Sequence, residues 1–209
     1  MKRAINPQES NRAEAFSLWM MSPQPMVTLT KTFDVSKLRK VSKKTGIKFN
    51  MLMCWCICKA ARSIDEFYEL PEADHLYRYD QLGVNVIVQN VKGGLTLCDV
   101  VFSEDLMQFN KDYLEATQLA ATTCQTITRE DAMIIGTSAL PYTELDGIIN
   151  QYAGRWNNPF VAWGKYRKGL LKTTLPISFQ FHHAQMDGMQ ACCFLNNLQH
   201  EIKNINVKQ

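Results

Sequence analysis

The chain has 209 residues, of which 46% are hydrophobic and 21% charged, a composition typical of a folded globular protein and unlike that of a disordered chain. The net charge of +3 is too balanced to indicate nucleic acid or an anionic membrane as a partner. The longest apolar run, residues 51–58, is far shorter than the roughly 20 residues of a membrane-spanning helix.

The cysteines and the N-terminus point to the cytoplasm. No apolar stretch follows the basic start of the chain, so we expect no signal peptide. Seven cysteines, an odd number, lie mostly in apolar segments, which favours buried thiols in a reducing compartment over disulfides. Three cysteines, Cys54, Cys56 and Cys58, have a spacing that points their thiols to different sides of a helix, and no second segment offers clustered metal ligands. We therefore expect them to pack in the core and to bind no metal.

Helices dominate the first third of the predicted structure. Ala13, Phe16 and Met20 recur at spacings of three and four residues, the period of one helix face. We expect, in chain order, a helix over 9–20, a strand over 26–33, a short helix that Ser36 caps and Gly46 ends, and a longer apolar helix from Asn50 to about Ile64.

Strands and helices are mixed in the rest of the chain. Lys92-Gly93-Gly94 fits a tight hairpin because glycine adopts positive φ at little cost. We expect strands over 84–91, 95–102, 134–139, 160–166 and 174–182, and helices over 105–121 and 189–203. These elements lack a regular βαβ rhythm, and no linker or repeat interrupts them. The sequence therefore predicts a single α+β domain over residues 1–209.

One segment combines residues that suit acid–base chemistry. A strand delivers His182 and His183, and a short polar turn leads to Asp187-Gly188 and a helix. Imidazole takes up a proton near neutral pH, so a histidine held at a strand end suits a general base. Adjacent strand residues point to opposite faces, so only one of the pair can face a given site. From these residues alone, two packed or surface histidines are an equally good interpretation.

A more specific pattern surrounds these histidines. His-His-Ala-x-x-Asp-Gly at 182–188 resembles the active-site signature of the chloramphenicol acetyltransferase family, and its core also occurs in dihydrolipoyl acyltransferases. Segment 11–16 is similar to the family's N-terminal arginine segment, Ser138-Ala139-Leu140-Pro141 to its Ser-Ala-Leu-Pro motif, and Lys165-Tyr166 to its Lys-Tyr pair. These segments follow the family's order and spacing, and no lipoyl or linker segment is present.

The resemblance implies a fold, an assembly and a reaction. The fold is the chloramphenicol acetyltransferase-like two-layer sandwich, with helices packed on one face of a mixed sheet. The assembly is a homotrimer with active sites at the subunit interfaces, each His183 reaching a pocket on its neighbour. The reaction is direct transfer of the acetyl group of acetyl-CoA to a small-molecule alcohol, first of all chloramphenicol, without a metal.

The resemblance also implies residue roles. His183 takes the hydroxyl proton of the acceptor, and Ser138 stabilises the tetrahedral oxyanion. Asp187 and Arg12 form an ion pair that fixes the site without touching the transferred proton, and His182 is structural. Lys165 and Tyr166 are implied cofactor-binding residues.

Some positions depart from the family pattern and weaken the choice of substrate. Trp19 stands where the family carries a drug-contacting tyrosine, and Ala162 where it carries a water-holding threonine. Of the residues implied to line the acceptor pocket, Ile148 is apolar but Asn150 is polar. Two alternatives therefore stay open: an O-acetyltransferase for another alcohol, and a binding protein of the same fold without activity.

Overall fold

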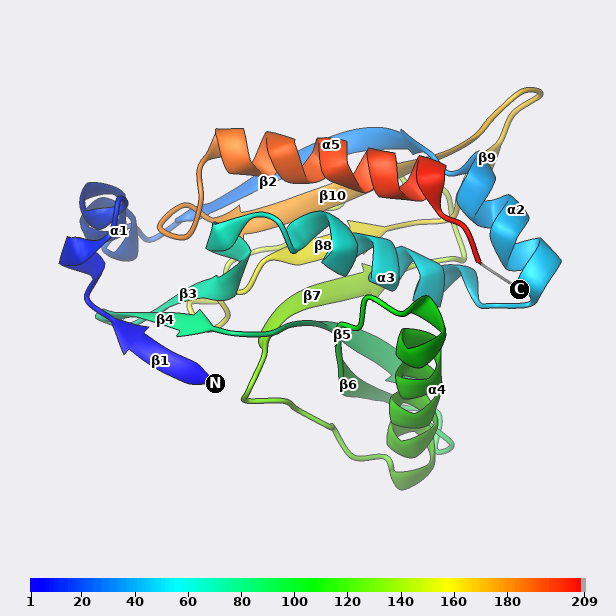
Figure 1. Cartoon of the computed structure of the whole chain (residues 1–209), viewed down its shortest axis with the longest axis horizontal. Coiled ribbons are helices and arrows are strands. Elements are labelled where there is room, and N and C mark those ends of the chain that lie inside the picture. The colour runs from blue at the N-terminus through cyan, green and yellow to red at the C-terminus, as the bar shows by residue number, and fades with distance from the viewer. Residues whose placement is uncertain (208–209) are drawn as a thin grey trace.

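The computed structural model describes residues 1–207 and contains both helices and strands (Figure 1). The helices are α1 (Ala13–Met20), α2 (Ser36–Thr45), α3 (Phe49–Ala61), α4 (Leu106–Thr123) and α5 (Gly188–Asn204), with short 3-10 turns η1 (Pro7–Glu9) and η2 (Asp65–Tyr68). The strands are β1 (Lys2–Ile5), β2 (Met26–Asp34), β3 (Glu69–Glu72), β4 (His75–Tyr79), β5 (Leu82–Gln89), β6 (Leu95–Val101), β7 (Met133–Ala139), β8 (Phe160–Trp163), β9 (Arg167–Lys168) and β10 (Thr173–His182).

The strands form one large mixed sheet and one small antiparallel sheet. The large sheet has the order β2-β10-β8-β7-β5-β6, and β9 pairs with β10. Its β5–β7 and β7–β8 pairs are parallel and the others antiparallel. The small sheet has the order β1-β4-β3. This mixed architecture confirms the predicted α+β class.

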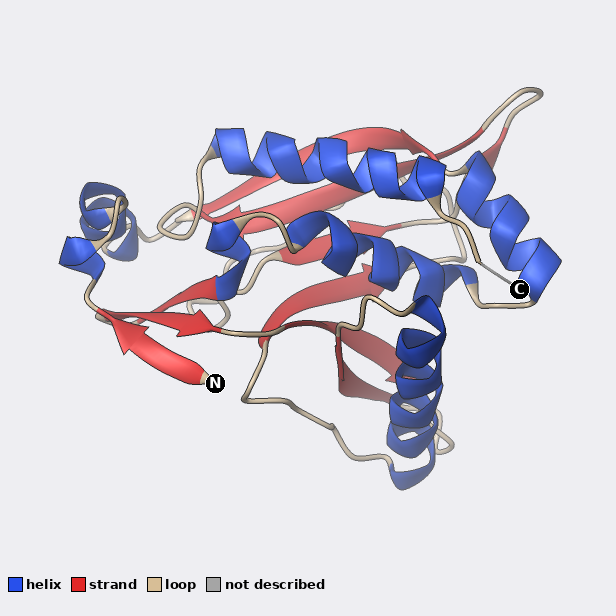
Figure 2. Cartoon of the chain, viewed as in Figure 1, coloured by secondary structure: helices blue, strands red, loops and turns tan. Residues whose placement is uncertain are grey.

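Helices cover one face of the large sheet, as predicted (Figure 2). Helix α3 is buried along nearly its whole length because apolar side chains occupy every side of it. Phe179 of β10 packs against Phe67 and Phe194, at ring-centroid distances of 5.8 and 4.6 Å. The core therefore lies between the sheet and the layer of α3 and α5.

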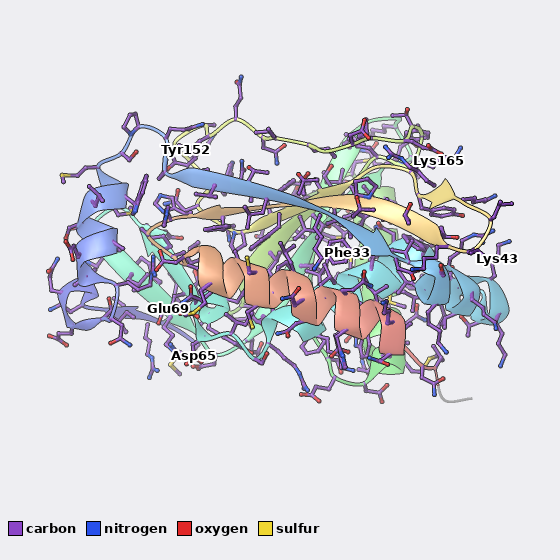
Figure 3. The ribbon with its side chains drawn as sticks, turned by 90° about the horizontal axis from the view of Figure 1, so that it is seen from above. Phe33, Lys43, Asp65, Glu69, Tyr152 and Lys165 are labelled. Atoms are coloured by element: carbon purple, nitrogen blue, oxygen red, sulfur yellow. The ribbon has the colours of Figure 1, made fainter. Side chains whose placement is uncertain are left out.

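The opposite face of the sheet is more polar and carries a row of aligned residues. Thr30, Ser178, Ala162 and Ser138 are register partners across β2, β10, β8 and β7, so their side chains share this face. Ser178 Oγ lies 2.8 Å from Thr30 Oγ1 and also accepts the backbone N–H of Ile148 at 2.8 Å. Figure 3 shows the connection from β7 to β8, labelled at Tyr152, on the side of the sheet away from α5.

The fold differs from the sequence prediction in several places. Neither Ser36 nor Asn50 caps its helix, because α2 follows Val35 and α3 follows Lys48, which places both residues in the first turn. The helix predicted over 9–20 begins at Ala13, because Pro7–Glu9 forms a separate 3-10 turn. The strand predicted over 160–166 ends at Trp163, because the N–H of Lys165 turns to the carbonyl of Thr143 at 2.7 Å. The small sheet is absent from the prediction, since its strands are only four or five residues long.

The hairpin prediction is confirmed between β5 and β6. Gly93 adopts a φ of +82°, and Asn90 Oδ1 accepts the N–H groups of Lys92 and Gly94 at 3.0 and 3.1 Å. Among residues 1–207 we find no helix whose length and hydropathy would let it cross a bilayer.

Candidate active site

The two histidines lie where β10 turns into α5, beside α1 (Figure 1). The N–H of His183 donates to the carbonyl of Pro25 at 2.9 Å, and the N–H of Gln185 turns back to the carbonyl of His182 at 2.9 Å. Asp187 then caps α5, its side chain accepting from the backbone of Gln190 while the side chain of Gln190 accepts from the backbone of Asp187. We call residues 182–188 the histidine turn.

Arg12 clamps the histidine turn from the N-terminal side of the chain. Its Nη1 and Nη2 donate to the carboxylate of Asp187 at 2.6 and 2.9 Å, because the planar guanidinium matches both carboxylate oxygens. Nη2 also donates to the carbonyl of His183 at 2.6 Å, and Nε to that of Ala184 at 3.2 Å. The bonds of Arg12 hold the pKa of Asp187 below its ordinary value of 3.8. One largely buried side chain thus fixes both the carboxylate and the backbone of the turn.

The imidazole of His183 is held on a face and on one edge. The indole of Trp19 stacks on it with ring centroids 4.3 Å apart and an angle of 6° between the planes. Its Nδ1 lies 3.2 Å from Asp187 Oδ1, although the alignment is too poor for a hydrogen bond, and no other group of residues 1–207 bonds to Nδ1. Nδ1 is itself buried whereas the side chain as a whole is 27% exposed, so the accessible edge is the one that carries Nε2.

His182 points the other way and is buried. Its Nδ1 accepts the N–H of Ala184 at 3.1 Å, which requires an unprotonated Nδ1. The ring of Tyr152 meets it edge-on at 6.1 Å. Burial, and secondarily the neighbouring His183, lower the pKa of His182 to about 4. His182 is therefore neutral in the folded protein near neutral pH.

This neutral, buried histidine predicts a pH dependence of stability. Its folded-state pKa lies below the unfolded value, so the unfolded chain binds more protons between these two values. The contribution of His182 to the free energy of unfolding is complete above about pH 6.5, and it falls by up to about 3 kcal/mol as the pH approaches 4. We expect His182→Gln to flatten the fall of the free energy of unfolding across this window, measured by urea unfolding at several pH values. Equal slopes for the variant and the wild type would contradict this assignment.

Ser138 does not lie beside His183 within one chain. It aligns with Ser178 through Ala162, and His183 follows Ser178 by five residues. Strand geometry then separates the Cα atoms of Ser138 and His183 by roughly 19 Å, on different faces of the sheet. The two side chains are too short to meet over that distance.

The other predicted site residues divide between the two ends of the sheet. Lys165 is exposed and lies at the opposite end of the sheet from Tyr152, which contacts His182 (Figure 3). Tyr166 is half-buried, 5.4 Å from the ring of Phe49 and 5.6 Å from the guanidinium of Arg39.

Ile148 and Asn150 belong to the segment that crosses the polar face between these ends. Their backbone groups bond to β10, since Ile148 N–H donates to Ser178 Oγ and the carbonyl of Asn150 accepts from Gln180 Nε2 at 2.8 Å. A cavity of about 470 Å³, lined by residues that include Arg62, Tyr68 and Phe102, includes none of the residues of the histidine turn.

Sequence reasoning left two features of the histidine turn unassigned. It gave Asp187 only the pairing with Arg12, whereas the structure also brings its carboxylate beside Nδ1 of His183. It also passed over Gln185, which is fully buried. A glutamine between the apolar residues Ala184 and Met186 was the available signal.

Comparison with known proteins decides the family. The family model described as chloramphenicol acetyltransferase matches residues 3–199. The chain belongs to this family. It is therefore an acyltransferase, and the resemblance predicted from the motifs is confirmed. Chloramphenicol acetyltransferase 2 of Escherichia coli is 26% identical over 200 residues, covering 93% of this chain and 94% of that protein. A chloramphenicol acetyltransferase of Clostridium perfringens is 27% identical over 206 residues, covering 96% and 98%.

Solved structures show the same fold. A chloramphenicol acetyltransferase superposes with a TM-score of 0.82 at 20% identity, covering 96% of this chain and 99% of that one. The dihydrolipoamide acetyltransferase of Azotobacter vinelandii gives a TM-score of 0.66 at 17% identity, covering 92% and 86%. The predicted chloramphenicol acetyltransferase-like sandwich is thus confirmed.

Proposed function

We propose that this chain transfers the acetyl group of acetyl-CoA to a hydroxyl of a small alcohol, with chloramphenicol as the first candidate acceptor. The observation that carries the proposal is the state of His183. Arg12 holds its carbonyl, Trp19 covers one face of its ring, and the Nε2 edge stays accessible. A base in such a fixed position is what proton transfer from an acceptor hydroxyl requires.

The proposed reaction forms no covalent bond between the enzyme and the acetyl group. Nε2 of His183 takes the hydroxyl proton while the acceptor oxygen forms a bond to the thioester carbonyl carbon. The resulting oxyanion accepts a hydrogen bond from the hydroxyl of Ser138. When the intermediate collapses, the carbon–sulfur bond breaks and the imidazolium returns its proton to the CoA sulfur, leaving the acetyl ester and CoA.

We propose that each active site lies between two copies of the chain. His183 and Ser138 belong to different ends of one sheet, so a site that uses both needs the histidine end of one copy against the serine end of the next. A head-to-tail contact whose rotation closes forms a ring, and the family resemblance supports a ring of three copies. Lys165 and Tyr166 lie at the serine end, where they would meet acetyl-CoA.

We also propose that residues 1–209 act as a single acetyltransferase domain in the cytoplasm. All seven cysteines, which lie within the described part of the chain, are free, and four of them are buried. Free thiols on the surface, Cys192 and Cys193, fit a reducing compartment.

The first test measures thiol release from acetyl-CoA with chloramphenicol. We expect turnover that depends on both substrates, and acetylated chloramphenicol as the product by mass spectrometry. Resistance of a host that expresses the protein would follow. No turnover with chloramphenicol in the presence of a correctly sized trimer, measured by light scattering, would overturn chloramphenicol as the acceptor.

A second candidate is acetyl transfer to a different alcohol. Trp19 covers His183 with an indole that has no hydroxyl, and Ala162 brings only a methyl group to the row that contains Ser138. These two positions alter the polar groups available to an acceptor. A panel of other hydroxyl compounds in the same assay separates this candidate from an inactive binding protein, which would release no thiol with any of them.

A further inference from the structure

Gln185 occupies a position of the histidine turn that the His-His-Ala-x-x-Asp-Gly pattern leaves open. The side chain is fully buried, and its Nε2 donates to the carbonyls of Glu69 at 2.6 Å and Glu66 at 3.1 Å. These carbonyls belong to η2 and the first residue of β3, 119 and 116 residues away along the chain. One amide of the turn therefore holds a distant segment of backbone.

Gln190 makes a second link between the same two parts of the molecule. Its Nε2 donates to Glu66 Oε1 at 2.9 Å, and its Oε1 accepts the N–H of Asp187 at 3.2 Å. The segment of η2 and β3 is thus tied both to the histidine turn and to the first turn of α5.

The segment that Gln185 holds is itself packed towards α1. The hairpin of β3 and β4 carries Leu76, which packs with Phe16 of α1 in a small apolar cluster. Helix α1 begins directly after Arg12 and carries Trp19. Both residues hold His183, since Arg12 binds its carbonyl and Trp19 stacks on its ring. The histidine turn is consequently held on one side by α1 and on the other by η2 and β3.

Hydrogen bonds from separate elements fix consecutive residues of the turn. Arg12 binds the carbonyls of His183 and Ala184, and the next residue, Gln185, is fixed by its own side chain. The peptide units that leave His183 therefore have little freedom to rotate. Because the direction of a side chain follows its backbone, such fixation sets where the imidazole points.

We propose that Gln185 is a positioning residue that sets the orientation of the His183 imidazole, an inference that rests on the proposed role of His183 as the base. Stability alone does not account for an amide here. Burying the amide has a desolvation cost that its two bonds offset only in part, because its Oε1 is buried and has no hydrogen-bond partner within residues 1–207. What an apolar side chain lacks is the fixed geometry of two hydrogen bonds.

The test replaces Gln185 with methionine, which keeps the length of the side chain and removes both bonds. Misplacing a base by about 1 Å lowers its rate by up to about 100-fold, so we expect kcat to fall about 10- to 100-fold. We expect KM values for both substrates to stay within about twofold, because the contacts of bound substrate are unchanged. The measurement is steady-state thiol release from acetyl-CoA.

Gln199→Met is the matched control. Gln199, on helix α5, also makes two bonds to backbone, accepting from the N–H of Asp34 at 2.9 Å and donating to its carbonyl at 3.1 Å. It lies at the far end of α5 from the histidine turn, so its loss is expected to lower Tm and leave kcat unchanged. Equal losses of kcat in the two variants would overturn the proposal, since they would show a general effect of lost stability.

A second readout does not depend on turnover. In ¹H–¹⁵N spectra of the imidazoles, His183 is assigned by its absence in His183→Ala and carries a ring-current shift from Trp19. We expect this shift to collapse in Gln185→Met and to persist in Gln199→Met. An unchanged His183 signal in Gln185→Met would overturn the positioning role, whether or not the wild type transfers acetyl groups. Absence of acetyl transfer by the wild type would overturn the proposed function and leave this spectroscopic test of the positioning role in place. If Gln185→Met does not fold, Gln185→Asn, which is too short to reach both carbonyls, carries the same expectations.

Discussion

Replacing His183 with alanine is expected to lower kcat for acetyl transfer by at least about 1,000-fold, the upper part of the range for loss of a positioned general base. Alanine leaves no accessible imidazole to accept the hydroxyl proton, because His182 is buried and points the other way, while Arg12 still binds Asp187 and the backbone of the turn. The fold and substrate affinity should therefore persist. Thiol release gives kcat for the variant and the wild type, and calorimetry gives the affinity of each for acetyl-CoA.

His200→Ala is the control for loss of a histidine. His200 is exposed on α5 and contacts Asn204 of the same helix, so its replacement should leave kcat unchanged. If His183→Ala kept a tenth or more of the wild-type kcat, the base would have to be another group, and the proposed mechanism would be wrong.

Mixing two impaired variants is expected to restore activity that neither has alone. Ser138→Ala loses the oxyanion donor, which typically lowers kcat about 100- to 1,000-fold, and His183→Ala loses the base. If each site takes its histidine from one copy and its serine from the next, a random mixed ring contains sites with both residues intact. After purification through both tags every trimer contains both variants, and one of its three sites has both residues intact, so about a third of the wild-type activity should return.

The mixing experiment needs co-expression of the two variants with different tags and purification through both tags. His183→Ala mixed with the double variant His183→Ala, Ser138→Ala is the control, and it should recover nothing because no copy supplies the base. Activity of the mixed rings no higher than the mean of the separate variants would contradict a site shared between copies. This outcome would also exclude a site that combines Ser138 with His183.

The parts of the site that the sequence predicted well are local in the chain. The strand that carries His182, the turn and the helix after Asp187 follow one another directly, so the polar turn and the capping residue indicate them without tertiary information. The alternation of facing residues also separates His182 from His183 correctly, because side chains alternate along any strand.

The parts that the sequence missed depend on contacts between distant segments. The strands of the small sheet are too short for their pattern to stand out, and the sheet exists because β1, from the start of the chain, pairs with β4 of the β3–β4 hairpin. Strand 160–166 was predicted too long because nothing in its composition announces the bond of Lys165 to Thr143. Gln185 gave no sign of its partners, which lie more than a hundred residues earlier.

By itself, the sequence determined the α+β class, the family and the residues of the histidine turn, since periodicity, turn chemistry and a short motif are properties of neighbouring residues. Only the tertiary structure decided that Arg12 binds the backbone of the turn as well as Asp187, that Trp19 stacks on His183, and that Ser138 lies at the other end of the sheet. The physical reason is that register and packing set these distances, and both arise from burial of the whole core between sheet and helices.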